Sequence, residues 1–126
     1  FANDVDIILG SHPHVLQKME KRTVTKEDGS TKDVFVIYSL GNFFSNQKDT
    51  GTKDSLILDI QVTKSGETDK MSIDSVSFTP IYCYKGNNTY ELIDLKKAVA
   101  NGSTSKTLLD VYQSALDRIN KTIIAQ

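Results

Sequence analysis

A short apolar run leads directly into the two histidines of the chain. Residues 5–9 have the sequence VDIIL and are followed by a glycine, a pattern that predicts a buried interior strand. His12 and His14 come next, separated by Pro13. Residues two apart in an extended segment point to the same face, and proline disfavours helical backbone for the residue before it. The sequence therefore predicts two imidazoles side by side at the end of a strand.

This histidine pair has the chemistry of half a metal site. Neutral imidazole is the commonest protein ligand for zinc, iron and similar ions. Both histidines could bind one metal ion, or one could bind it while the other meets a substrate; a hydrogen-bonded pair that packs the strand end is the structural alternative. A complete site needs further ligands. Asp4 and Asp6 are expected at the opposite end of the strand, about 20 Å away at ~3.3 Å per residue, and the chain has no other histidine.

A second segment follows the next apolar strand. Residues 16–24 and 34–38 flank an Asp-Gly turn signal at 26–30, which predicts a hairpin whose returning strand is covered on both faces. Residues 39–53 then show no periodicity and predict a long loop, of a length that often serves function. In a parallel or mixed sheet this loop would open on the same edge as the histidines. Asn42 is the candidate there for substrate binding, with core packing by the neighbouring phenylalanines as the alternative.

Two more strands and a helical tail complete the pattern. Apolar alternation predicts strands over 56–62 and 71–78, and the second slips by one residue at Asp74, as a β-bulge requires. Pro80 is expected to end that strand, with a short edge segment after it. In the tail, Asp94 can cap a short helix that stops at an Asn-Gly pair. A longer helix follows, with an apolar stripe at helical spacing: Leu108, Tyr112, Ala115, Leu116, Ile119 and Ile123.

Composition excludes several classes of protein. The chain has 126 residues, 38% of them hydrophobic and 25% charged, which is typical of one soluble globular domain. Its net charge of −1 gives no basic footprint for nucleic acid. No apolar stretch approaches the ~20 residues that span a bilayer. The single cysteine, Cys83, is expected to be a small core residue rather than a nucleophile.

The two unusual segments together resemble a known family. The sequences DVDIILGSHPHVLQ and VIYSLGNFFSNQ are similar to the bacterial capsule-synthesis proteins of the CapA/PgsA type, which are associated with poly-γ-glutamate capsules. The motifs occur in the family's order, and the likeness covers roughly residues 3–80. The family itself resembles the calcineurin-like metallophosphoesterases, whose fold is a two-sheet sandwich flanked by helices.

The resemblance implies a fold and a set of metal ligands. The fold class is α+β: mostly mixed or antiparallel strands, then two C-terminal helices, forming the C-terminal half of a metallophosphoesterase-like sandwich. Residues 1–126 would be a single partial domain, β-rich over 1–85 and helical over 86–126. A late Gly-x-His-x-His element of that superfamily supplies metal ligands and maps onto Gly10, His12 and His14. The superfamily's earlier ligand motifs do not occur in this chain.

The resemblance also implies a function. It implies a capsule or poly-γ-glutamate synthesis or export protein at the bacterial cell surface, with the polymer and membrane synthase components as partners and a membrane anchor ahead of Phe1. Two divalent metal ions are expected in the intact protein. This chain is expected to be a piece that holds none tightly, is inactive alone, and can self-associate through an uncovered sheet face. A fragment of a metal-dependent phosphoesterase and a non-catalytic surface scaffold are the alternatives.

Overall fold

Three strands form a first sheet around a buried central strand. The computed structural model describes residues 5–102 and 104–124. Within them, β1 (Ile7–Leu9), β2 (Met19–Thr25) and β3 (Thr31–Ile37) pair in the order β1-β3-β2. β3 runs parallel to β1 and antiparallel to β2. Its last four residues are all buried, so the prediction of a returning strand covered on both faces is confirmed.

β1 is an edge strand, which corrects the prediction of a buried interior strand. It pairs only with β3 among the described strands, and it is three residues long. Ile8 is 38% exposed and Leu9 is 56% exposed. The apolar run at 5–9 has the composition of a buried strand, but β3 satisfies only one of its two edges. Asp6 lies at the predicted far end, where it pairs with Lys32 at 3.0 Å. Asp4 lies outside the described residues.

A second sheet is antiparallel throughout. β4 (Asp54–Lys64), β5 (Met71–Gly86) and β6 (Thr89–Asp94) pair in the order β4-β5-β6. The register shifts where Gln61 faces Ser75 and Val62 faces Ile73, which leaves Asp74 as the extra residue. The predicted β-bulge is thereby confirmed.

The prediction that Pro80 ends its strand is wrong. β5 continues through Pro80, and residues 81–84 form part of the central strand rather than an edge segment. The Cys83 N–H donates to the Lys53 carbonyl, so odd-numbered residues here direct their N–H groups towards β4. Pro80 therefore faces the other side, where β6 pairing begins only at Ile81. Its missing N–H removes no bond from the ladder.

The tail contains a strand that the sequence pattern did not predict. β6 lies within the segment expected to be helical, and it pairs with β5 across an Asn-Asn turn. The helices then follow as predicted. Asp94 accepts a hydrogen bond from the Lys97 N–H at the start of α1 (Leu95–Asn101), and Gly102 ends it in the left-handed conformation.

α2 (Lys106–Ile124) carries the predicted core face. Four residues of its stripe are buried in the hydrophobic core, where α2 packs against β4 and β5 of the second sheet: Tyr112, Ala115, Ile119 and Ile123. Cys83 is buried as predicted. No helix within residues 5–102 and 104–124 is long and apolar enough to cross a membrane.

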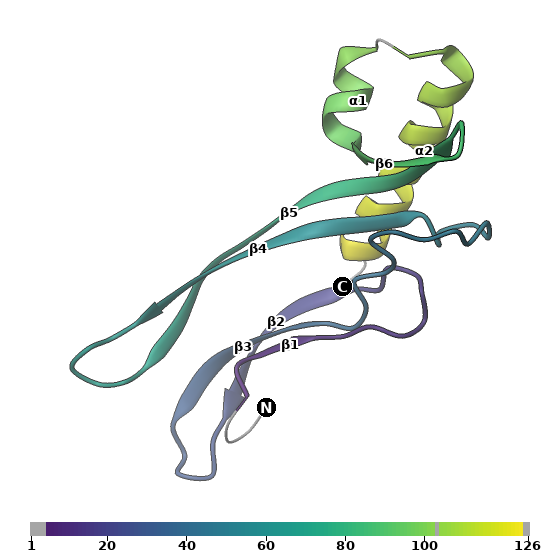
Figure 1. The fold of residues 1–126 in the computed structure, drawn as a ribbon. Coiled ribbons are helices and arrows are strands. Elements are labelled where there is room, and N and C mark those ends of the chain that lie inside the picture. The colour runs from purple at the N-terminus through teal and green to yellow at the C-terminus, as the bar shows by residue number, and fades with distance from the viewer. Residues whose placement is uncertain (1–4, 103, 125–126) are drawn as a thin grey trace.

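The sheets and helices give the α+β fold expected from the sequence (Figure 1). The turns of the β2–β3 and β4–β5 hairpins project together at one end of the molecule. The loops at 10–18 and 39–53 lie at the other end (Figure 1). The fold thus separates the hairpin tips from both segments singled out in the sequence. That the chain is half of a larger metallophosphoesterase-like sandwich stays a prediction.

A part-buried ion pair attaches α2 to the second sheet. Arg118 donates from Nε to Asp54 Oδ2 at 2.7 Å and from Nη2 to Oδ1 at 3.0 Å. The Asp54 side chain is only 5% exposed, whereas that of Arg118 is 40% exposed. Asp54 begins β4, so this bidentate contact fixes α2 beside the end of the loop at 39–53.

Replacing Arg118 by alanine should destabilise the fold. Arg118→Ala leaves the buried Asp54 carboxylate without its partner, which costs about 3 kcal/mol of unfolding free energy. Urea denaturation followed by circular dichroism measures this cost. Arg22→Ala is the matched control, because Arg22 pairs with Glu20 in an exposed setting and its loss should cost much less. Equal losses in the two variants would contradict the account.

Candidate functional site

The two segments singled out in the sequence are joined by backbone hydrogen bonds. The Gly10 N–H donates to the Ile37 carbonyl at 2.8 Å, and the Leu40 N–H donates to the Gly10 carbonyl at 3.1 Å. Further along, the Gln17 N–H donates to the Ser39 carbonyl at 3.0 Å. Because each bond joins one segment to the other, residues 10–17 and 37–42 form a single structural unit.

Two glycines allow this close approach. A Cβ on Gly10 would lie 2.1 Å from the Tyr38 carbonyl oxygen. Gly41 has a φ of +71° and would place a Cβ 2.8 Å from the Asp54 carbonyl oxygen. Gly41 also forms a β-bridge with Ser55, which ties the unit to the second sheet. Any side chain at these two positions would push the segments apart.

The histidine segment is bent rather than extended, which corrects the predicted strand-end geometry. β1 ends at Leu9, and residues 12–15 form a bend. His12 has a φ of 110° and His14 a φ of 62°, both positive values that are uncommon outside glycine. The spacing of two therefore does not place the imidazoles on one face by strand geometry. A strained backbone sets their positions instead.

The structure brings His14 and Asn42 together, although they are 28 residues apart. His14 Nδ1 lies 2.9 Å from Asn42 Oδ1. Asn42 Nδ2 donates to the Thr52 carbonyl at 3.0 Å and to Gln47 Oε1 at 2.7 Å. The expectation that the loop opens beside the histidines is confirmed by this contact. The substrate-binding role of Asn42 stays a prediction.

The described residues do not by themselves form a complete metal site. Both histidines are exposed, and no described residue hydrogen-bonds to the His12 ring. Within residues 5–102 and 104–124, no three His, Cys, Asp or Glu side chains group closely enough to hold a metal ion. Two exposed imidazoles fit a metal centre as contributors, and further ligands would have to complete it.

The strand that leads into the second segment ends in a charged cluster. Tyr38 donates to Glu20 Oε1 at 2.6 Å, and Arg22 donates to the same oxygen at 2.7 Å. The hydrogen bonds from Arg22 and Tyr38 lower the pKa of Glu20 to about 2. The bond to Glu20 in turn raises the pKa of Tyr38. Glu20 therefore remains ionised and holds the Tyr38 hydroxyl in place.

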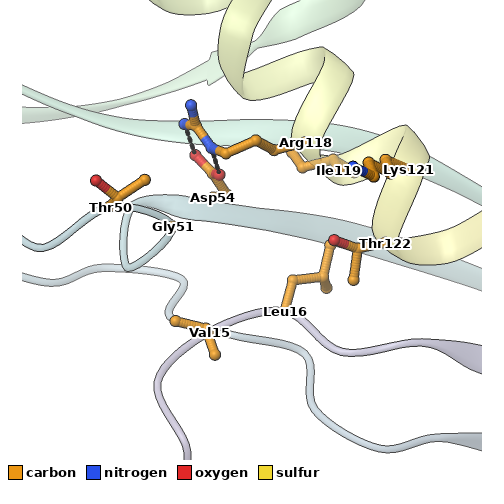
Figure 2. Close-up of a pocket in the computed structure, with 9 residues that line it drawn as sticks. All are labelled: Val15, Leu16, Thr50, Gly51, Asp54, Arg118, Ile119, Lys121 and Thr122. Atoms are coloured by element: carbon orange, nitrogen blue, oxygen red, sulfur yellow. Dashed lines mark hydrogen bonds and ion pairs between the residues drawn. The ribbon is translucent and has the colours of Figure 1, made fainter.

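A pocket of about 240 Å³ lies next to the joined segments (Figure 2). The Asp54–Arg118 ion pair lies on one side of it, and Val15 and Leu16 lie on the other (Figure 2). None of the three predicted site residues lines it. No periodicity or spacing predicts the Asp54–Arg118 contact, since the two residues are 64 positions apart.

Comparison with known proteins finds a family that matches the N-terminal part of the chain. Residues 1–47, which contain both histidines and Asn42, match the family described as bacterial capsule synthesis protein PGA_cap. This match agrees with the resemblance that the two motifs predicted.

Two relatives are of the CapA type. The chain is 39% identical over 61 residues to the PGA biosynthesis protein CapA of Bacillus subtilis (strain 168) and to the capsule biosynthesis protein CapA of Bacillus anthracis. The matched stretch is 48% of this chain, but only 14% of the first relative and 13% of the second. No solved structure matches the chain.

The close approach at Gly41 should be sensitive to a single methyl group. Gly41→Ala combines a left-handed backbone with a clash against the Asp54 carbonyl. Gly29→Ala is the matched control, because Gly29 has a φ of +81° but no atom within 4 Å of an added Cβ. We expect Gly29→Ala to cost about 1–2 kcal/mol and Gly41→Ala on the order of 1–3 kcal/mol more. Chemical denaturation measures both, and equal costs would contradict the packing described at Gly41.

Proposed function

We propose that this protein acts in the assembly or export of a capsule polymer at the bacterial cell surface, and that His12 and His14 contribute to a metal centre in that role. The observation that carries the proposal is the His14–Asn42 contact. It brings together, at one end of the fold, the two motifs that resemble the capsule-synthesis family. A shared contact between distant motifs favours a common site over two independent structural roles.

The backbone at the histidines supports a functional role for them. Residues in sparsely populated conformations persist only where surrounding structure holds them, and they cluster at functional sites. His12 and His14 both have positive φ angles, yet their rings are exposed. The strained backbone at His12 and His14 therefore does not serve to bury their rings in the core. It presents two imidazoles at the surface.

The metal centre of this proposal is shared with ligands beyond the two histidines. The His12 and His14 imidazoles would supply nitrogen ligands to one or two divalent ions, and this chain alone would be inactive. A bound divalent ion would supply Lewis-acid stabilisation of charge on an ester or a bound water. His14 and His12 would orient that chemistry, and the neighbouring pocket of about 240 Å³ offers room for part of a substrate.

The partners of this proposal follow from the relatives' described roles. One relative is described as a PGA biosynthesis protein and the other as a capsule biosynthesis protein. We propose poly-γ-glutamate or a related capsule polymer as the substrate class, membrane synthase components as partners, and attachment to the membrane through a segment other than the helices described. A metal-dependent phosphoesterase is the second candidate, favoured by the exposed histidine pair. A non-catalytic surface scaffold is the third, favoured by the incomplete ligand set.

Gene disruption and complementation test this proposal. Disrupting the gene in an encapsulated strain that carries it should remove the capsule, measured as glutamate released by acid hydrolysis of purified polymer. The unaltered gene should restore the polymer. His14→Ala should restore at least about tenfold less, on the scale of effects seen when a metal site is disturbed.

The control variant is Thr23→Ala. Thr23 is exposed on β2, and among the described residues its hydroxyl donates to Asp33, at 2.8 Å, so this variant should restore the polymer fully. Full restoration by His14→Ala would overturn the metal role and support a scaffold. An unchanged capsule after disruption would overturn the capsule role, and phosphodiester hydrolysis by the protein with added Mn²⁺ would then support a phosphoesterase.

A further inference from the structure

The Asn42 side chain is oriented by a backbone carbonyl. The oxygen and nitrogen of an Asn amide are nearly the same size, so its two flipped orientations are distinguished by their hydrogen-bond partners. The Thr52 carbonyl, 3.0 Å from Asn42 Nδ2, can only accept a hydrogen bond. The nitrogen must therefore face Thr52, and Asn42 Oδ1 must face His14.

That orientation determines where the His14 ring carries its proton. Asn42 Oδ1 can only accept, and it lies 2.9 Å from His14 Nδ1. His14 Nδ1 must therefore be the donor. A neutral imidazole has a single N–H, so His14 Nε2 keeps its lone pair. The ring is exposed, and no described residue hydrogen-bonds to Nε2.

We propose that Asn42 is a positioning residue that selects the Nδ1–H tautomer of His14 and presents the Nε2 lone pair as a ligand atom. Metal-binding histidines characteristically donate their other ring N–H to an oxygen, which fixes both tautomer and ring orientation. Asn42 has that relation to His14. The tautomer of His14 is inferred from its hydrogen bonding alone, whereas the use of Nε2 as a metal ligand rests on the proposed function.

The residues around Asn42 are themselves held in place by further hydrogen bonds. Thr52 is buried, and its hydroxyl donates to the Asp49 carbonyl at 2.7 Å. The Gln47 N–H donates to Ser45 Oγ at 3.1 Å. The preceding residue, Gly41, is bridged to Ser55. Asn42 therefore lies on an ordered support, as a residue that orients another side chain requires.

Nitrogen-15 NMR of the histidine rings tests the tautomer in the unaltered chain. Long-range ring correlations recorded at about pH 9, where free imidazole is uncharged, distinguish a protonated ring nitrogen from one with a lone pair. We expect His14 to show a protonated Nδ1 and an unprotonated Nε2. His12, which has no described partner, is the internal reference and should show the mixture typical of free histidine. A His14 ring protonated at Nε2 would overturn the proposal without any variant.

Variants separate positioning from general stability. Asn42→Ala should shift His14 towards the Nε2–H form and weaken Zn²⁺ binding by about tenfold. Asn42→Asp retains an acceptor for Nδ1–H and should restore the tautomer. Ser55→Ala is the matched control, because it removes the 2.7 Å bond to the Leu40 carbonyl and leaves Asn42 intact.

The two readouts test two different claims. An unchanged tautomer in Asn42→Ala, or an equal change in Ser55→Ala, would overturn the positioning role. A correct tautomer with no Zn²⁺ binding, even in the complete protein, would contradict the proposed metal centre and leave the positioning of His14 by Asn42 supported.

Discussion

The backbone crossing between residues 10–17 and 37–42 is the contact on which the rest of the structure depends. It continues the first sheet beyond the end of β3, and Gly41 then carries the chain onto the second sheet through its bridge to Ser55. Gly10 and Gly41 make it possible, because a side chain at either position would meet a backbone oxygen. The same crossing brings His14 to Asn42. The link between the sheets and the candidate site are thus one feature of the fold.

Local patterns predicted most of the elements but not their partners. The Asp-Gly hairpin, the bulge at Asp74 and the Asp94 cap were all predicted, because short-range geometry determines each of them. β6 was missed because it is short and not a periodic segment, and its pairing with β5 is what makes it a strand. The edge position of β1 was missed because burial depends on neighbours that an apolar run does not specify.

The candidate site shows the same division between what local patterns predict and what distant contacts determine. The motifs identified His12, His14 and Asn42, but strand geometry was the wrong basis for placing the histidines. The backbone bonds that flank the bend, the His14–Asn42 bond and the Asp54–Arg118 pair all join residues at least 22 positions apart. β1 leaves Ile8 and Leu9 exposed at a sheet edge. The self-association expected through an uncovered sheet face stays a prediction.

Paramagnetic broadening by Mn²⁺ tests most directly the claim that the crossing carries a metal-binding histidine. Mn²⁺ broadens NMR signals close to its binding site even when it binds weakly. The account predicts selective broadening of the ring signals of His14 and of the amides of Gly41 and Asn42, with the distant hairpin at 26–30 unaffected, and loss of that pattern in His14→Ala. Broadening centred instead on the acidic residues of the β4–β5 hairpin, or an unchanged pattern in His14→Ala, would contradict it.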